Sequence, residues 1–214
     1  MQEFIEGYQE FKDIEIQNYK ALFKDLVEHG QKPKALFIGC SDSRVVPTLI
    51  TNSLPGELFV VRNIGNFVAP FQPDSEFHAT AAAIEYATDV LEVENIIVCG
   101  HSDCGAIGAL FKDIKKNENN IHTIKWLSLG APAKNYVLEH MPNGEKTELL
   151  RYTTKVSVVL QLKNLLSYPS VKKRVEDKKL FLHGWHYNIE TGEILYYSKK
   201  EGLFIPLEEA ENVQ

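Results

Sequence analysis

Residues 34–44 read Lys-Ala-Leu-Phe-Ile-Gly-Cys-Ser-Asp-Ser-Arg, an apolar run that enters a glycine and then becomes polar. A short apolar run of this kind predicts a buried strand. Two more such runs follow, Glu-Leu-Phe-Val-Val-Arg at 57–62 and Asn-Ile-Ile-Val-Cys-Gly at 95–100. Apolar residues at helical spacing predict helices over 76–91 and 104–116. Alternating strands and helices predict an α/β fold, with a mostly parallel central sheet flanked by helices on both faces.

The chain before this core has the pattern of a helical arm. Over 4–29 apolar residues recur at a spacing of three and four, which predicts an amphipathic helix, broken near Ile14 and ended by Gly30. We therefore expect an N-terminal helical arm, residues 1–30, followed by a single α/β domain, residues 31–214. Because the arm precedes the sheet, we expect it to pack on another subunit.

The chain after the core has further helical and strand patterns. We expect a polar loop over 117–123, helices over 146–167 and 170–178, and strands over 180–187 and 194–198. Glu190-Thr-Gly-Glu193 is typical of a turn between the last two strands. The sheet should therefore end in antiparallel strands at its C-terminal side.

Composition excludes several classes of function. The formal net charge is −6, and an acidic surface argues against binding nucleic acid. No run approaches the ~18 apolar residues of a membrane-spanning helix, and the N-terminal residues lack the pattern of a signal peptide. Three cysteines form an odd set that does not suggest a disulfide framework. We expect a cytoplasmic protein, in which cysteines close to a histidine are more often ligands or catalytic groups.

Two short motifs follow the first and third predicted strands. Cys40 begins the first, and His101 and Cys104 belong to the second, His-Ser-Asp-Cys-Gly. Ligands of an open parallel sheet bind at the carboxyl ends of its strands, so both motifs should face the same crevice. One imidazole and two thiolates suit zinc. Since no fourth protein ligand is evident, the fourth position should be open to water, as in a catalytic site.

Asp42 and Arg44 follow the first cysteine closely. Two thiolates and a neutral imidazole cancel the charge of a zinc ion, so its surroundings must help to lower the pKa of bound water. Asp42 could bind the metal or accept a proton from that water. Arg44 could hold the carboxylate ionised and away from the metal through a bidentate pair.

Each of these residues also has a plainer interpretation. The two cysteines and the histidine could be core residues or a redox set, and Asp42 with Arg44 could be a structural ion pair. We interpret Asp103 as a helix N-cap and Cys99 as a small buried hydrophobe. Arg62 could line the crevice or pair with a carboxylate. The remaining histidines are expected to be surface or packing residues, His183 and His186 lying on opposite faces of one strand, although any near the mouth could transfer protons.

The motifs together resemble the β-class carbonic anhydrases. The resemblance rests on Cys-Ser-Asp-Ser-Arg at 40–44, Val-Arg-Asn-Ile-Gly-Asn at 61–66 and Gly-His-Ser-Asp-Cys-Gly at 100–105. It continues through Ala-Ala-Ile-Glu-Tyr at 82–86 and Gly-Trp-His-Tyr at 184–187, and so covers about residues 30–190.

The resemblance implies a function and a role for each matching residue. The family hydrates carbon dioxide reversibly to bicarbonate and a proton by a zinc-bound hydroxide, with one zinc per subunit of a homodimer or homotetramer. The implied zinc ligands are Cys40, His101 and Cys104, and the implied catalytic pair is Asp42 and Arg44. The resemblance also implies a substrate pocket lined by Gln31, Phe59, Ile64 and Tyr86. Gly105 matches a position whose neighbouring backbone amides help to polarise the substrate. In the family the glutamine can come from the partner subunit, and the N-terminal arm crosses the dimer interface.

Some family members are closed at low pH by an aspartate that moves onto zinc, with bicarbonate bound nearby. That subset has a tryptophan where this chain has Phe37, although Tyr187 resembles another residue of the bicarbonate site. We therefore expect the open type. Two other hypotheses remain: a hydrolase of carbon disulfide or carbonyl sulfide on the same zinc site, and a zinc-stabilised binding or sensor protein without catalysis.

Overall fold

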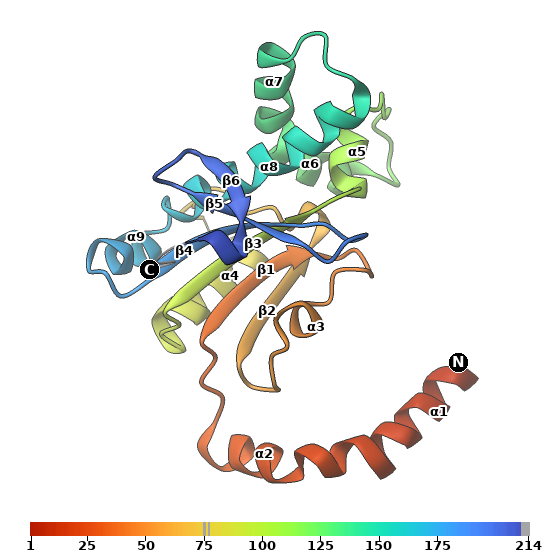
Figure 1. Cartoon of the computed structure of the whole chain (residues 1–214), viewed down its shortest axis with the longest axis vertical. Coiled ribbons are helices and arrows are strands. Elements are labelled where there is room, and N and C mark those ends of the chain that lie inside the picture. The colour runs from red at the N-terminus through yellow and green to blue at the C-terminus, as the bar shows by residue number, and fades with distance from the viewer. Residues whose placement is uncertain (75, 77, 211–214) are drawn as a thin grey trace.

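A computed structural model describes residues 1–74, 76 and 78–210, and its centre is a six-stranded sheet (Figure 1). The strand order is β2-β1-β3-β4-β5-β6. The strands are β1 (Ala35–Cys40), β2 (Leu58–Asn63), β3 (Asn95–His101), β4 (Phe181–Tyr187), β5 (Ile194–Ser198) and β6 (Leu203–Pro206). The first four are parallel, whereas β5 and β6 pair antiparallel, which confirms the predicted fold class.

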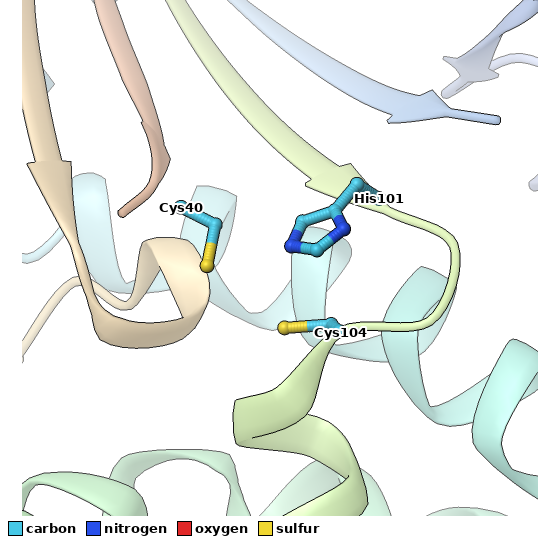
Figure 2. A group of neighbouring side chains, drawn as sticks. All are labelled: Cys40, His101 and Cys104. Carbon is cyan, nitrogen blue, oxygen red and sulfur yellow. The ribbon is translucent and has the colours of Figure 1, made fainter. Parts of the chain in front are cut away.

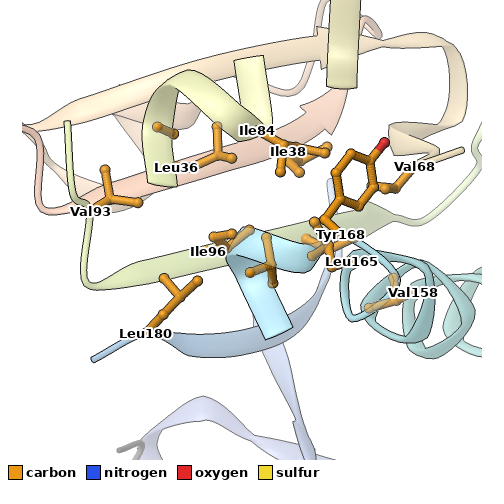
Figure 3. Close-up of a cluster of buried hydrophobic side chains, with 13 residues drawn as sticks. Leu36, Ile38, Val68, Ile84, Val93, Ile96, Val158, Leu165, Tyr168 and Leu180 are labelled. Carbon is orange, nitrogen blue, oxygen red and sulfur yellow. The ribbon is translucent and has the colours of Figure 1, made fainter. Parts of the chain in front are cut away.

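Helices pack on the sheet and extend from it. They are α1 (Gln2–Glu10), α2 (Ile16–His29), α3 (Pro47–Thr51), α4 (Ala79–Glu85), α5 (Gly105–Leu110), α6 (Ile121–Leu127), α7 (Ala131–His140), α8 (Lys146–Leu165) and α9 (Pro169–Glu176). The main core lies where α4, α8 and α9 cover one face of β1 and β3 (Figure 3). There Ile38, Ile84 and Leu165 are fully buried, each contributing about 2 kcal/mol of hydrophobic stabilisation.

The opposite face of the sheet is packed differently. Its buried residues, Ala35, Phe37, Ile97 and Cys99, contact partly buried strand residues such as Trp185. The rings of Phe37 and Trp185 meet edge to face with centroids 6.2 Å apart. Within the described chain this cluster is formed by strand residues, with no helical side chain in it, so the expectation that helices cover both faces is wrong for this part of the sheet.

Strand and helix boundaries agree with the sequence pattern where apolar periodicity is strong. The three core strands and the long helix α8 lie within a few residues of their predicted ranges. The helix expected over 104–116 ends early, at Leu110, because the polar stretch after it offers no apolar face to bury. The loop expected over 117–123 instead leads into α6 at Ile121. The sequence pattern also failed to indicate α3, α7 and β6.

The N-terminal arm is one long curved helix that projects from the body (Figure 1). The regular α-helix is interrupted near Ile14, as expected, but by a π-helical turn at Phe11–Glu15 that keeps the helix continuous from α1 to α2. The arm has no buried residue in this chain, and Phe4 and Tyr8 are 76% and 61% exposed. Its base is anchored on Gly56, where an added Cβ would lie 2.7 Å from Leu26 Cδ2. In the part of the chain that the structure describes, no helix combines the length and apolarity needed to cross a membrane.

Candidate metal centre and active site

Three ligand side chains meet at the carboxyl ends of β1 and β3. Cys40 ends β1, His101 ends the neighbouring parallel strand β3, and Cys104 precedes α5. All three are buried, and their ligand atoms lie within 4.8 Å of one another. The two thiols and the imidazole point into one common space (Figure 2). The sequence predicted this convergence, because neighbouring parallel strands end at the same edge of a sheet.

A sharp turn between His101 and Cys104 makes the convergence possible. Asp103 has a φ of 55°, in the left-handed region, which turns the chain back towards the strand end. Cys104, rather than Asp103, occupies the N-cap position of α5. The interpretation of Asp103 as an N-cap is therefore wrong, and its backbone conformation is its contribution to the site.

The protonation of His101 suits metal binding. Its Nδ1 lies 2.8 Å from the carbonyl oxygen of Ser102, so Nδ1 must carry the proton and donate it. Its Nε2 is buried and has no hydrogen-bond partner among the described residues. A buried, unpartnered nitrogen lone pair beside two thiols fits zinc, which accepts nitrogen and sulfur ligands in a tetrahedron.

The two cysteine thiols share a proton. The interaction with the neighbouring Cys104 thiol lowers the pKa of Cys40 to about 4. The same interaction, together with burial, raises the pKa of Cys104 far above its usual value. The interaction therefore favours a thiolate on Cys40 and a thiol on Cys104 in the metal-free pair. By contrast, burial raises the pKa of Cys99 to about 12, as expected for a core thiol.

Zinc binding to the metal-free protein at about pH 7 is expected to release about one proton. Cys104 is the ligand expected to lose a proton, because the pKa of Cys40 is lowered and that of Cys104 is raised far above its usual value. Calorimetric titration with zinc in buffers of different ionisation enthalpy measures this number. A value of two would show that the thiols do not share a proton.

Asp42 and Arg44 form a bidentate ion pair next to the ligands. Arg44 Nε donates to Asp42 Oδ1 at 2.9 Å, and an Arg44 terminal nitrogen, Nη2, donates to Oδ2 at 2.8 Å. The Arg44 amide also donates to Oδ1 at 3.0 Å. These bonds hold the pKa of Asp42 well below its usual range. The carboxylate stays ionised, and both of its oxygens face the guanidinium.

Arg62 stabilises the loop that carries this pair. Its Nε donates to the carbonyl oxygen of Cys40 at 3.0 Å, and its Nη2 donates to that of Asp42 at 2.6 Å. From the sequence we expected Arg62 to line the crevice or to pair with a carboxylate, whereas in the structure it binds backbone carbonyls.

Trp126 also contacts the site, although the sequence did not predict it. Its Nε1 donates to the carbonyl oxygen of Ile64 at 2.7 Å. A single tryptophan outside any motif does not indicate such a hydrogen bond to a distant backbone carbonyl.

The expected pocket residues fall into separate places in the single chain. Ile64 lines a cavity of about 790 Å³ together with Ser41 and Asn63, next to the metal ligands. Phe59 and Tyr86 stack on each other with ring centroids 5.8 Å apart. Gln31 is exposed at the base of the arm. Gly105 begins α5 and has open space where a Cβ would be.

Two other histidines occupy opposite sides of β4, as expected. His183 lies 2.9 Å from Asn95 Oδ1 through its Nε2, and His186 packs near the Phe204 ring. Both are buried, which lowers the pKa of each to about 4. Neither belongs to the group of ligand atoms.

Known proteins resemble the chain over nearly its whole length. The family model described as carbonic anhydrase matches residues 35–194. A carbonic anhydrase of a Synechocystis species is 42% identical over 92% of this chain and 71% of that protein. One of Helicobacter pylori is 40% identical over 95% of this chain and 93% of that protein.

Solved structures agree with the sequence relatives. The structure of the β-carbonic anhydrase CcaA has a TM-score of 0.87 and 40% identity, covering 96% of this chain and 98% of that one. A structure from a study of two tetrameric β-carbonic anhydrases of Sordaria macrospora has a TM-score of 0.73 and 29% identity, covering 91% and 92%. Together with the matched family model and the converging ligand atoms, these likenesses show that the chain belongs to the carbonic anhydrase family, and within it to the β class.

Proposed function

We propose that this protein hydrates carbon dioxide reversibly to bicarbonate and a proton, with one zinc ion held by Cys40, His101 and Cys104. One observation carries the proposal. Two thiols and an unpartnered imidazole nitrogen converge within 4.8 Å, beside a carboxylate that is ionised and held by an arginine. Three ligands of this type are typical of a catalytic zinc site.

Zinc bound here would supply a Lewis acid that makes water nucleophilic near neutral pH. The protein's own groups would do the remaining work. Asp42, ionised by Arg44, would accept a hydrogen bond from the attacking water and orient it. Arg44 would keep the carboxylate away from the ligand set. Amides near Gly105 would polarise a substrate oxygen, since no side chain covers the start of α5.

We assign the substrate pocket to residues from two subunits. Ile64 lines the cavity next to the metal ligands, whereas Gln31, Phe59 and Tyr86 are not among the described residues that line it. The stacked rings of Phe59 and Tyr86 would complete an apolar wall from a partner chain, together with Gln31. Such a wall would suit a small apolar molecule such as carbon dioxide.

Stopped-flow hydration of carbon dioxide, on protein with measured zinc content, tests the proposal. The same preparation is assayed for hydrolysis of carbon disulfide and carbonyl sulfide. Hydration should be the dominant activity between about pH 7 and 9, the range in which zinc-bound water ionises. Zinc-loaded protein that is inactive towards carbon dioxide would contradict the proposal, and it would support the sensor hypothesis if all three substrates failed. Neither alternative is favoured, because the relatives named above are carbonic anhydrases.

We expect the site to remain open rather than to be closed by bicarbonate. Phe37 is fully buried and offers no N–H group where the regulated subset has a tryptophan. The Arg62 guanidinium is already bonded to two backbone carbonyls, so it is not free to bind a bicarbonate ion. Without bound bicarbonate, Asp42 would stay paired with Arg44.

We also propose the division into arm, residues 1–30, and catalytic domain, residues 31–214, and assembly into a homodimer or homotetramer through the arm. The arm exposes Phe4, Tyr8 and other apolar side chains that a second copy would bury. Solved structures of this family include tetramers, as the Sordaria macrospora study states. A cytoplasmic location is consistent with three free cysteines.

Replacing both Phe4 and Tyr8 by aspartate is expected to dissociate the oligomer. Each ring would bury up to about 200 Å² at an interface, and a carboxylate cannot be buried there without a partner. Light scattering after size exclusion should show the mass of a single chain. Lys20→Asp, at an exposed polar position of the same arm, should leave the mass unchanged. An unchanged mass for the double variant would show that the arm does not hold the copies together.

A further inference from the structure

Hydration of carbon dioxide releases one proton per turnover, and a residue that carries this proton away must be reachable from the metal ligands. The inference below rests on the proposed function. Asp42 cannot serve, since its two oxygens face the Arg44 guanidinium at 2.9 and 2.8 Å. A carrier at neutral pH should be an imidazole, whose ordinary titration range includes neutral pH.

One cavity is lined both by residues that adjoin the ligands in the chain and by such a residue. Ser41 and Ile64 line one part of it, and Asp74 and His78 line another. Ser41 directly follows the ligand Cys40, so this part of the wall adjoins the metal centre. The cavity volume of about 790 Å³ leaves ample room for water, whose share of the liquid volume is about 30 Å³.

The wall between these two parts is built from directly bonded residues. Asn63 ends β2 opposite Cys40 in the strand register. Its Nδ2 lies 3.3 Å from Thr80 Oγ1 and also donates to the carbonyl oxygen of Phe67. Thr80 is two residues after His78 at the start of α4. The contact between β2 and α4 therefore brings His78 to the same cavity that Ser41 lines.

His78 has a suitable partner and access to solvent. Its Nε2 lies 2.9 Å from Asp74 Oδ1, and the two side chains are 44% and 37% exposed. Nε2–H donates to Asp74, and Nδ1, which has no hydrogen-bond partner among the described residues, is the nitrogen that would accept a proton. The Asp74 carboxylate holds the imidazole ring in place through this hydrogen bond.

Other titratable groups are less suitable. The cavity is also lined by Glu76 and Glu85, but the side chain best suited to carry a proton near neutral pH is an imidazole. Burial raises the pKa of Tyr168 to about 12. The remaining histidines lie elsewhere: His29 on the arm, His122 and His140 on α6 and α7, His183 and His186 buried on β4, and His101 among the ligands.

We propose that His78 is the proton-transfer residue of the enzyme, assisted by Asp74. The proton released during hydration passes through water in the cavity to His78 Nδ1, which forms the imidazolium. That imidazolium then gives one proton to a buffer base in solvent and returns to its neutral form. In the reverse direction the same steps deliver a proton for dehydration of bicarbonate.

Stopped-flow hydration by the zinc-loaded His78→Ala variant tests the proposal at several buffer concentrations. In dilute buffer kcat should fall about tenfold or more, while kcat/KM stays within about twofold, because kcat/KM does not include proton transfer to buffer. Added imidazole or concentrated buffer should restore kcat. Asp74→Asn should give a smaller loss of kcat. The backbone bond from the Ala82 amide to the His78 carbonyl is retained in the variant.

His122→Ala, an exposed histidine outside the cavity lining, is the matched control and should keep the wild-type kcat at every buffer concentration. Two results would overturn the proposal: an unchanged kcat in dilute buffer, or an equal loss of kcat and kcat/KM that imidazole does not rescue. An inactive wild-type enzyme would instead overturn the proposed function, and this proposal with it.

Discussion

Replacing Cys104 by serine is expected to remove zinc and to reduce carbon dioxide hydration by roughly a thousandfold or more. A serine hydroxyl does not ionise near neutral pH and is a poor zinc ligand, so two ligands would remain of the three. The buried His101 Nε2 would then lose the ion that satisfies it. Because metal binding free energy adds to folding free energy, the variant should also have a lower Tm than the zinc-loaded wild type. Zinc per chain by mass spectrometry, activity and Tm are measured on the same preparation.

Cys99→Ala provides the matched control for this variant. Cys99 is another buried thiol on β3, but it packs in the apolar cluster with Phe37 and Ile97 and is not one of the three converging side chains. Its truncation should cost about 1 kcal/mol of stability through a small cavity and leave zinc content and activity intact. If Cys104→Ser kept full zinc and full activity, the ligand set assigned here would be wrong.

Replacing Arg44 by alanine is expected to reduce kcat/KM by roughly a hundredfold while zinc remains bound. The variant loses the three hydrogen bonds that the guanidinium donates, two to the carboxylate oxygens of Asp42 and one to the carbonyl oxygen of Asp103. Asp42 would then be free to turn towards the zinc and compete with water. Arg44→Lys should recover only part of the activity, because an ammonium group cannot form the bidentate pair. Arg151→Ala, at an exposed arginine of α8, should behave as the wild type.

The pH dependence separates this role from a merely structural ion pair. Arg44 depresses the pKa of Asp42, so the stabilising effect of the pair is complete above the unfolded pKa of about 3.9 and is lost as pH falls through the folded value. Protonation of Asp42 should therefore not limit wild-type activity above about pH 5. In Arg44→Ala the pKa of Asp42 should rise towards its ordinary value. A double-mutant cycle with Asp42→Asn measures the coupling, and fully additive losses would mean that Arg44 does not act through Asp42.

The sequence determined much of the fold and the ligand set. Buried parallel strands are encoded in short apolar runs such as 35–40 and 95–101, so local composition was enough to predict them. Cys40, His101 and Cys104 follow from their positions at strand ends, because the topology of a parallel sheet brings such ends together. The antiparallel C-terminal strands were also predicted as far as β5, since the turn residues at 190–193 are a local signal.

Elements without strong periodicity were predicted poorly. The helices α3 and α6 and the strand β6 are only 5, 7 and 4 residues long, too short for a periodic pattern to emerge. Polar side chains also define some of these boundaries, as where the Asn117 amide donates to Asn120 Oδ1 just before α6. Such contacts depend on backbone geometry that the residue types alone do not specify.

The sequence alone predicted the sheet, three residues that could hold a metal ion, and an aspartate and an arginine beside them. The tertiary structure decided how these groups are held. It places Arg62 on the carbonyls of Cys40 and Asp42, fixes the tautomer of His101 and brings His78 to the cavity beside the metal centre. The physical reason is range: strand and helix patterns arise from neighbouring residues, whereas the hydrogen-bond partner of a side chain depends on chain segments that only folding brings together.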